Sequence, residues 1–319
     1  MQNLDKFKNK NIFISGGAGI IGKHLVQKLI DINANLLVGD IKKCPKNFIG
    51  KVKYLRKDLN TLKIKELKNF KPDVFIHLAA TYERTQETKE FFENNFHNNI
   101  KLSNYLITII SKIKSIKKII FASSYLVYSS DLYLNKKNKK PYKLHEASSL
   151  NPRNLIGAAK LYHESELKFL SNFRSDISIT SARIFRGYGL GSRDIISRWI
   201  RDLIKKKEIN IYGISSSFDF IYCKDTAESI LKMINLSHKF KIVNVGFGQS
   251  IKINDILKIF NLEFKNIKKN KIKGNQLIEN SCADISFIKK KMKLNLRYSI
   301  KKGIREIIEY EKKRIKYSN

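Results

Sequence analysis

The stretch Gly16-Gly17-Ala18-Gly19-Ile20-Ile21-Gly22 decides the fold of this chain. It follows the apolar segment 11–15, which is typical of a buried strand, and it opens a helical pattern over 19–32. Its glycines satisfy both G-x-G-x-x-G and G-x-x-G-x-x-G, and glycine lets a backbone turn tightly and approach a pyrophosphate. The N-terminus of the helix would offer N–H groups and a positive dipole end to the phosphates. The stretch therefore predicts a dinucleotide-binding turn, with Gly16, Gly17, Gly19, Ile20, Ile21 and Gly22 as cofactor-binding residues; a purely structural glycine turn is the alternative.

An acidic residue follows at the offset that such a turn requires. Asp40 ends a predicted strand over 36–40, about 20 residues after the glycines. A carboxylate at this position binds the ribose hydroxyls of NAD and repels the additional phosphate of NADP. Lys42 and Lys43 lie close by and weaken this discrimination. The sequence predicts NAD as the cofactor and leaves NADP open.

Apolar runs and helical patterns continue to alternate beyond this unit. The predicted strands span 52–55, 73–79, 118–122 and 177–184, and the predicted helices span 89–113, 153–173 and 300–315. Near-continuous apolar strands separated by helices indicate a parallel sheet that is covered on both faces. The predicted fold class is α/β, a doubly wound parallel sheet of the Rossmann type with a smaller C-terminal substrate-binding lobe.

The pattern becomes less regular after residue 184, where several glycines cluster. We therefore assign residues 1–184 to the NAD-binding domain, with 218–246 returning to it. Residues 185–217 and 247–319 are assigned to the substrate lobe.

The composition limits the compartment and the partners. No apolar run reaches the roughly 18 residues of a membrane helix, no secretory leader is evident, and the three cysteines lack C-x-x-C spacing. These features predict a cytoplasmic protein without a membrane partner. The net charge of +35 raises the possibility of nucleic-acid binding, but the lysine runs are dispersed and are not interleaved with aromatic residues. A solvated basic surface is the favoured interpretation, without a specific nucleic-acid site, and its field would attract an anionic substrate.

Further motifs occur in a fixed order along nearly the whole chain. They are Asp58-Leu59, His77-Leu78-Ala79-Ala80, Asn95, the segment 121–128 (F-A-S-S-Y-L-V-Y), the segment 183–189 (R-I-F-R-G-Y-G), the segment 218–225 (F-D-F-I-Y-C-K-D), the segment 243–246 (V-N-V-G) and Ala283-Asp284. Together with the glycine turn, this ordered set resembles the extended short-chain dehydrogenase/reductase family in its nucleotide-sugar epimerase/dehydratase branch.

The resemblance implies several functional residues and partners. Asp58 and Leu59 would contact the adenine, and Leu78, Ala79, Ala80 and Asn95 would complete the cofactor site. Ser124 would bind the reacting sugar oxygen, and Lys160 would hold the nicotinamide ribose. The substrate would be a nucleotide-activated sugar, and a homodimer would form through the helices near 89–113 and 153–173.

The resemblance fails at the residue that moves the proton. The family carries Y-x-x-x-K on one helix, and the i, i+4 spacing puts both side chains on one face. The lysine lowers the pKa of the phenol, which transfers a proton during hydride transfer. Here Lys160 is retained, but the tyrosine position is Ile156, which transfers no proton. We hypothesise that Tyr125 replaces it; a packed aromatic at the strand end is the alternative and the favoured interpretation.

The substrate side also departs from the family. Arg186 stands where relatives carry an asparagine, and Phe218 stands where they carry an arginine that binds the diphosphate. We hypothesise that Arg186 or Lys273 binds the diphosphate instead, since a guanidinium makes bidentate contacts from a different anchor.

The predicted function is 4-epimerisation or 4-keto reduction of a nucleotide sugar. In related dehydratases, Asp-Glu follows the active-site threonine, whereas Tyr125-Leu126 follows Ser124 here, which disfavours 4,6-dehydration. The alternative is a catalytically silent NAD-binding protein with a regulatory or scaffold role, as the loss of the tyrosine would suggest. The sugar and the nucleotide base stay open.

Overall fold

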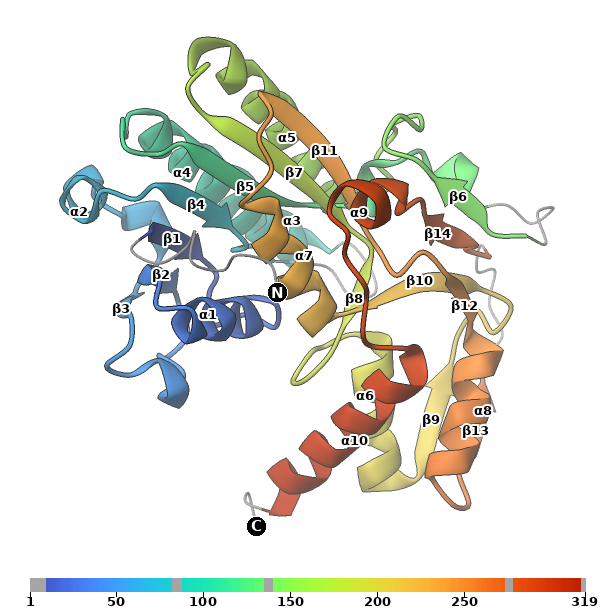
Figure 1. The fold of residues 1–319 in the computed structure, drawn as a ribbon. Helices are drawn as coiled ribbons and strands as arrows, with labels where there is room; N and C mark the ends of the chain where they lie inside the picture. Colours follow the sequence, from blue (N-terminus) through green and yellow to red (C-terminus); the bar gives the residue numbers. More distant parts are fainter. Residues whose placement is uncertain (1–9, 82–87, 135–139, 273–277, 317–319) are drawn as a thin grey trace. The chain divides into compact units, whose positions relative to one another are not determined.

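The computed structural model describes residues 10–81, 88–134, 140–272 and 278–316 (Figure 1). The chain forms two compact units. The first unit comprises residues 1–127, 152–183 and 227–243, and the second comprises 128–151, 184–226 and 244–319.

A seven-stranded sheet organises the first unit within the described ranges. Across the sheet its strands are β11 (Phe240–Val245), β7 (Ser178–Ile184), β5 (Lys118–Ser124), β4 (Val74–His77), β1 (Asn11–Ser15), β2 (Asn35–Asp40) and β3 (Lys53–Arg56). The register is parallel from β3 through β2, β1 and β4 to β5, so that Ile14 lies opposite Val38 on one side and Ile76 on the other. The central strands β1 and β4 consist of nearly unbroken buried residues because helices cover both faces, whereas the edge strand β3 has no buried residue. The predicted fold class is confirmed.

Helices lie on both faces of this sheet. They are α1 (Gly22–Asp31), α2 (Ile64–Phe70), α3 (Lys89–Asn95), α4 (Leu102–Ser111), α5 (Leu155–Phe173) and α7 (Cys223–Met233). Figure 1 shows α1 and α7 on one side, where Lys28 and Glu228 form an ion pair at 2.7 Å, and α4 and α5 on the other. The main core cluster, which includes Phe13, Phe75 and Phe121, is buried between sheet and helices.

The predicted helix over 89–113 is present, but it contains a π-helical segment. This segment, η4 (Phe96–Lys101), links α3 to α4. A π turn widens the helix and is frequently found at functional sites. Here it accompanies the buried Asn99, whose side chain accepts a hydrogen bond from the Thr81 backbone N–H at 2.9 Å and donates one to the Thr81 carbonyl at 3.1 Å.

The second unit contains short sheets and four main helices in its described part. A three-stranded sheet comprises β12 (Ser250–Lys252), β10 (Ser217–Tyr222) and β8 (Arg186–Tyr188), and two-stranded sheets pair β13 (Lys268–Lys271) with β9 (Glu208–Ile211) and β14 (Ser281–Ala283) with β6 (Tyr142–Leu144). The helices are α6 (Ile195–Lys206), α8 (Ile253–Glu263), α9 (Ser286–Lys291) and α10 (Ile300–Lys316). Their core gathers around Trp199, Phe260 and Ile304.

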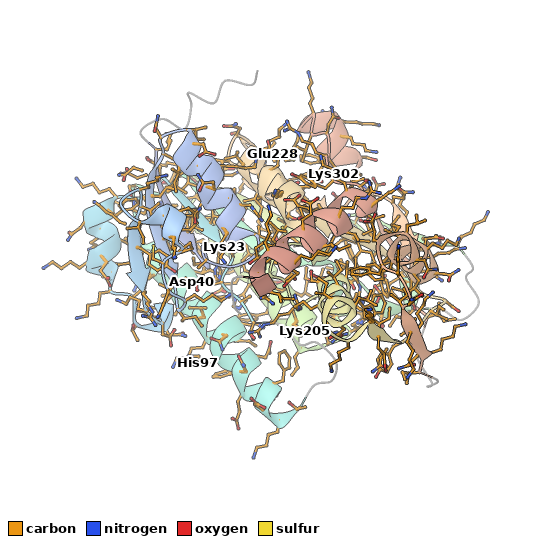
Figure 2. The ribbon with its side chains drawn as sticks, turned by 90° about the horizontal axis from the view of Figure 1, so that it is seen from below. Lys23, Asp40, His97, Lys205, Glu228 and Lys302 are labelled. Carbon is orange, nitrogen blue, oxygen red and sulfur yellow. The ribbon has the colours of Figure 1, made fainter. Side chains whose placement is uncertain are left out.

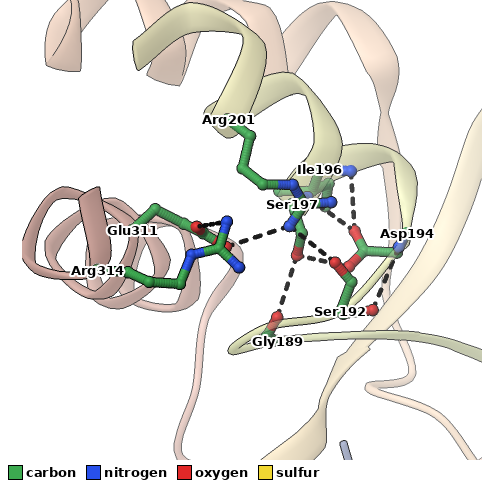
Figure 3. A network of polar contacts seen from close by, with 8 residues as sticks. All are labelled: Gly189, Ser192, Asp194, Ile196, Ser197, Arg201, Glu311 and Arg314. Carbon is green, nitrogen blue, oxygen red and sulfur yellow. Dashed lines mark hydrogen bonds and ion pairs between the residues drawn. The ribbon is translucent and has the colours of Figure 1, made fainter. Parts of the chain in front are cut away.

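Polar contacts connect α6 to the C-terminal helix α10 (Figure 3). Asp194 caps α6 by accepting hydrogen bonds from the backbone of Ile196 and Ser197. Glu311 is fully buried on α10 and pairs with Arg201 of α6 at 3.1 Å and with Arg314 at 2.9 Å. Breaking a buried ion pair leaves an uncompensated charge, so these contacts hold α10 against α6. Among the residues that the structure describes, no helix is both long and apolar enough to span a membrane.

Candidate active site

The glycine turn lies where β1 ends and α1 begins, and its geometry requires glycine. Gly16 has φ of +76°, in the left-handed region, and a Cβ there would lie 2.5 Å from the Ala79 backbone nitrogen. A Cβ on Gly22 would overlap the carbonyl of Gly16. The residue before α1, Ile21, has no side-chain acceptor for the first N–H groups of the helix. The turn thus brings backbone close to backbone and leaves the helix N-terminus suited to an anionic group.

Two backbone donors fix the carboxylate of Asp40 at the end of β2. Asp40 Oδ2 accepts from the Ala18 N–H at 2.9 Å, and Oδ1 accepts from the Lys42 N–H at 3.0 Å. Each carboxylate oxygen can accept more than one hydrogen bond, so the group keeps capacity for ribose hydroxyls. The following residue, Ile41, is 69% exposed. Its apolar side chain would not bind the additional phosphate of NADP, although the next residue, Lys42, also lines the cavity.

A cavity of about 300 Å³ lies beside the turn and Asp40. Eight predicted cofactor-binding residues line it: Gly16, Gly19, Asp40, Asp58, Leu59, Leu78, Ala79 and Ala80. Lys42, which the sequence placed close to Asp40, also lines it, and the remaining lining residues were not singled out from the sequence: Ile41, Lys57, Thr81, Asn94, Asn98 and Leu102. Asn95 is buried and accepts from Asn99 Nδ2 at 2.7 Å, and Asn99 holds Thr81 in the cavity wall. The structure therefore puts Asn95 behind the wall, where it would act through Asn99.

Asp58 lies on the cavity wall at the start of the 3₁₀ turn η3 (Leu59–Thr61). Its Oδ1 accepts from the Asn60 backbone N–H at 2.9 Å, and its Oδ2 lies 3.0 Å from His97 Nε2. Burial by itself would raise the pKa of this carboxyl, but the hydrogen bonds from Asn60 and His97 outweigh it and lower the pKa. Asp58 is thus a carboxylate with a fixed orientation.

The predicted catalytic residues lie on three adjoining elements of the first unit. Ser124 ends β5, Tyr125 begins the 3₁₀ turn η5 (Tyr125–Val127), and Lys160 lies on α5. Helix α5 contacts both β5 and η5. Gly157 makes this approach possible, because a Cβ there would overlap the carbonyl of Leu126. The packing brings the first turns of α5 together with the end of β5.

Lys160 is buried, and its ammonium faces an aromatic ring. Its Nζ lies 4.8 Å from the ring centroid of Phe121, on the same strand as Ser124. Burial lowers the pKa of Lys160 to about 8, against a smaller opposing effect of the Glu164 carboxylate. Nζ makes no hydrogen bond within the described ranges of the chain, so its donors stay available to a ligand. Ser123 precedes Ser124 on β5, and its buried Oγ likewise has no hydrogen-bond partner among the described residues.

On the predicted substrate side, Arg186 and Phe218 come together within the second unit. The guanidinium carbon of Arg186 lies 4.0 Å from the centroid of the Phe218 ring, and its Nη2 donates to Glu279 Oε2 at 2.9 Å. Lys273, the other predicted diphosphate ligand, lies outside the described residues.

Comparisons with known proteins agree with these features. The sequence profile of the NAD dependent epimerase/dehydratase family matches residues 12–246. A protein of Methanocaldococcus jannaschii named putative UDP-glucose 4-epimerase is 30% identical over 263 residues, which cover 79% of this chain and 82% of the relative. The chain belongs to the NAD-dependent epimerase/dehydratase family.

Two other members of the family illustrate its range. The dTDP-4-dehydro-6-deoxyglucose reductase of Escherichia coli is 29% identical over 291 residues, covering 83% of this chain and 84% of the relative. The solved UDP-N-acetylglucosamine 4-epimerase of Methanobrevibacter ruminantium M1, in complex with UDP-N-acetylmuramic acid, is 26% identical with a TM-score of 0.82 and covers 96% of this chain and 99% of that one.

The family's cofactor is NAD, and the residues of this chain fit it. The glycine turn permits backbone approach, Asp40 is an oriented acceptor in the cavity, and the amine of Lys160 makes no hydrogen bond within the described ranges. Ile156, which stands where the sequence resemblance implies a tyrosine, lies in the first turn of α5 and one turn before Lys160. Ile156 is buried and contributes only apolar surface. Tyr125 is also buried, with 4% of its surface exposed, at the end of the strand that carries Ser124.

Proposed function

We propose that this chain is an NAD-dependent enzyme that performs hydride chemistry at a carbon of a nucleotide-activated sugar, either 4-epimerisation or 4-keto reduction. The observation that carries this proposal is the buried amine of Lys160, which lies against Phe121 on the strand of Ser124 and makes no hydrogen bond to any described residue, in a unit that also has the glycine turn and Asp40. The named relatives with epimerase and reductase activities support the same chemistry.

Each residue has a distinct role in this proposal. Ser124 donates a hydrogen bond to the sugar oxygen at the reacting carbon, and Lys160 binds the ribose hydroxyls next to the nicotinamide. NAD, when bound, accepts the hydride and returns it. Asp40 orients the adenosine ribose, and Arg186 binds the diphosphate of the sugar nucleotide.

Tyr125 is the proposed carrier of the proton that the family's tyrosine would move. It is the phenol nearest in sequence to Ser124, and it begins the turn against which the start of α5 packs. The proposal assigns to the Lys160 ammonium the role of stabilising the Tyr125 phenolate, as a positive charge close to a phenol does. The proposal thus keeps general acid–base catalysis and moves its source from α5 to η5.

We further propose that the chain forms a homodimer. Five aromatic residues of the first unit expose more than half of their surface on two helical segments in contact: Phe92, Phe96, Tyr162, Phe169 and Phe173. Grouped apolar side chains of this kind mark protein interfaces. The proposed interface would join these helices to those of a second copy.

The experiment that tests the function starts from the purified protein. Any nicotinamide that co-purifies is identified, and the protein is then incubated with UDP-, dTDP- and GDP-sugars while NADH fluorescence and product NMR spectra are recorded. A redox change or a new sugar is the expected result. Bound NAD without turnover on any sugar, together with activity that appears only in Ile156→Tyr, would instead identify a cofactor-binding protein without chemistry of its own.

A further inference from the structure

The π-helical segment η4 brings a histidine to the edge of the cofactor cavity. His97 is the second residue of this segment, and its Nε2 lies 3.0 Å from Asp58 Oδ2, across 39 positions of sequence. Asp58 lines the cavity together with Asp40. In Figure 2, His97 and Asp40 lie in the same part of the first unit, viewed from below. His97 therefore contacts a residue of the cavity wall and belongs to none of the sequence motifs of the family.

Asp58 is held from two directions. Its own turn, η3, supplies the Asn60 backbone N–H and the Asn60 side-chain amide to Oδ1, at 2.9 and 3.0 Å. The separate segment η4 supplies His97 to Oδ2. Without His97, the carboxylate would keep only contacts from its own turn and could rotate about its side-chain torsions. With His97, the plane of the carboxylate is fixed relative to the cavity.

A carboxylate fixed in this way is a selective acceptor. It accepts a hydrogen bond from an exocyclic amino group and repels a carbonyl oxygen at the same position. Leu59 follows Asp58 in the wall, and Ile41 offers an exposed apolar side chain on the same cavity. The combination suits the 6-amino edge and the face of an adenine.

We propose that His97 is a positioning residue that makes the cofactor site selective for adenine over a 6-oxo purine, by fixing the carboxylate of Asp58 as an acceptor. The inference rests on the proposed placement of the cofactor's adenine against Asp58 and Leu59. The role requires a donor at Nε2 and not a positive charge, because both the imidazolium and the Nε2–H tautomer donate. Glutamine, which has a side-chain N–H donor, can therefore replace histidine.

The test compares dissociation constants of NAD and of nicotinamide hypoxanthine dinucleotide, in which oxygen replaces the 6-amino group. Both are measured by calorimetry on the full-length protein, after removal of any co-purifying nucleotide. The variants are His97→Ala, His97→Gln and Asp58→Asn, with Lys101→Ala as the matched control because Lys101 is exposed on the same π-helical segment. Melting temperatures show that each variant is folded.

The expected result is a change of preference rather than a general loss of binding. His97→Ala reduces the preference for NAD by about five- to tenfold, as expected for a hydrogen bond to a charged group. His97→Gln restores most of it, Lys101→Ala leaves it unchanged, and Asp58→Asn abolishes or reverses it. If His97→Ala weakens both dinucleotides equally, or leaves the ratio unchanged, the histidine is only structural and the inference is wrong. Asp40→Ala tests the cofactor site separately: undiminished NAD affinity in that variant would refute the proposed site, and the role of His97 with it.

Discussion

Arg186 and Phe218 form a stacked pair in the second unit, with the guanidinium carbon 4.0 Å from the centroid of the ring. The sequence resemblance implies a diphosphate-binding arginine at position 218, whereas in this chain residue 218 is phenylalanine and the guanidinium of Arg186 lies over its ring. Arg186 on β8 thus places a guanidinium next to residue 218 on the neighbouring strand β10, with which β8 pairs. Stacking on an aromatic ring also restricts the orientation of the guanidinium plane.

Arg186→Ala is expected to weaken binding of the nucleotide sugar by more than tenfold and to leave NAD affinity unchanged, because Arg186 belongs to the second unit and Asp40 and the glycine turn to the first. Calorimetry with UDP and with uridine, the nucleoside that lacks the diphosphate, separates the diphosphate contribution. Arg186→Lys keeps the charge but loses the bidentate geometry and should recover only part of the affinity. Equal UDP affinity in wild type and Arg186→Ala would remove Arg186 from the substrate site.

Lys160 predicts the alkaline limb of a pH profile. Burial lowers its pKa to about 8, so the amine loses its charge as the pH rises through this value. The positive charge favours an anionic cofactor and a neighbouring phenolate, so NAD affinity and turnover are both expected to fall above about pH 8. Lys160→Arg should keep the charge and move this limb to higher pH, while Lys160→Met should eliminate it and weaken NAD binding. A wild-type NAD affinity that stays flat from pH 6 to pH 10 would contradict the assigned role.

Tyr125 and Ile156 can be separated by their substitutions. Tyr125→Phe removes only the hydroxyl, and it is expected to lower turnover by about 100-fold or more with little change in NAD affinity, as for the loss of a general acid or base. Full activity of Tyr125→Phe would show that Tyr125 is a packed aromatic. The double variant Tyr125→Phe/Ile156→Tyr then tests whether a tyrosine at position 156, where the resemblance implies one, restores the turnover lost in Tyr125→Phe.

Lys118 predicts a dependence of stability on pH that is unrelated to activity. It is buried and donates hydrogen bonds to Ser178, Thr180 and the carbonyl of Leu236, and burial lowers its pKa to about 7 from an ordinary value of 10.5. Between these two pH values the unfolded chain binds the proton that the folded chain has lost, so stability rises with pH. The expected gain from pH 7 to pH 10 is about 3 kcal/mol.

The difference between wild type and Lys118→Gln isolates this contribution, because other groups also titrate over the range. Chemical denaturation at several pH values should show the free energy of unfolding of wild type rising relative to that of the glutamine variant. Parallel curves for the two proteins would mean that Lys118 keeps its proton in the folded state.

The proposed dimer is tested by a charge on its aromatic surface. Phe169→Asp should convert a dimer to a monomer in light-scattering measurements, because an unpaired carboxylate would be buried in the interface. Leu262→Asp is the matched control: Leu262 is 75% exposed on α8 and is not one of the residues of the proposed interface. A monomeric wild-type protein, or a dimer that survives Phe169→Asp but not Leu262→Asp, would contradict the proposal.

Local pattern was sufficient to predict the first unit closely. The predicted strand over 11–15 matches β1, and the predicted helix over 153–173 matches α5 (Leu155–Phe173) within two residues. Such strands and helices can be predicted because their apolar residues recur with the period of the strand or helix. The glycine turn was equally predictable, because a tight turn between a strand and a helix leaves no room for Cβ atoms and therefore requires glycine at fixed spacing.

Contacts between distant residues could not be predicted in this way. The π-helical segment adds no distinctive residue type, and it becomes visible only through the contacts of Asn99 with Thr81 and of His97 with Asp58. The substitutions at positions 186 and 218 were apparent in the sequence, but their stacking was not. Likewise, the pairing of Arg186 with Glu279 joins residues 93 positions apart.

Gly157 has a consequence for how this active site can change. The start of α5 is set against η5 by the contact between Gly157 and the carbonyl of Leu126, and by Asn154, which caps the helix through the Gly157 N–H at 2.9 Å. Neither contact uses the side chain at position 156. These contacts, which help to position Lys160, would therefore be kept if residue 156 were tyrosine instead of isoleucine. The side chain at position 156 can in this sense be changed while the contacts that hold the start of α5 are retained.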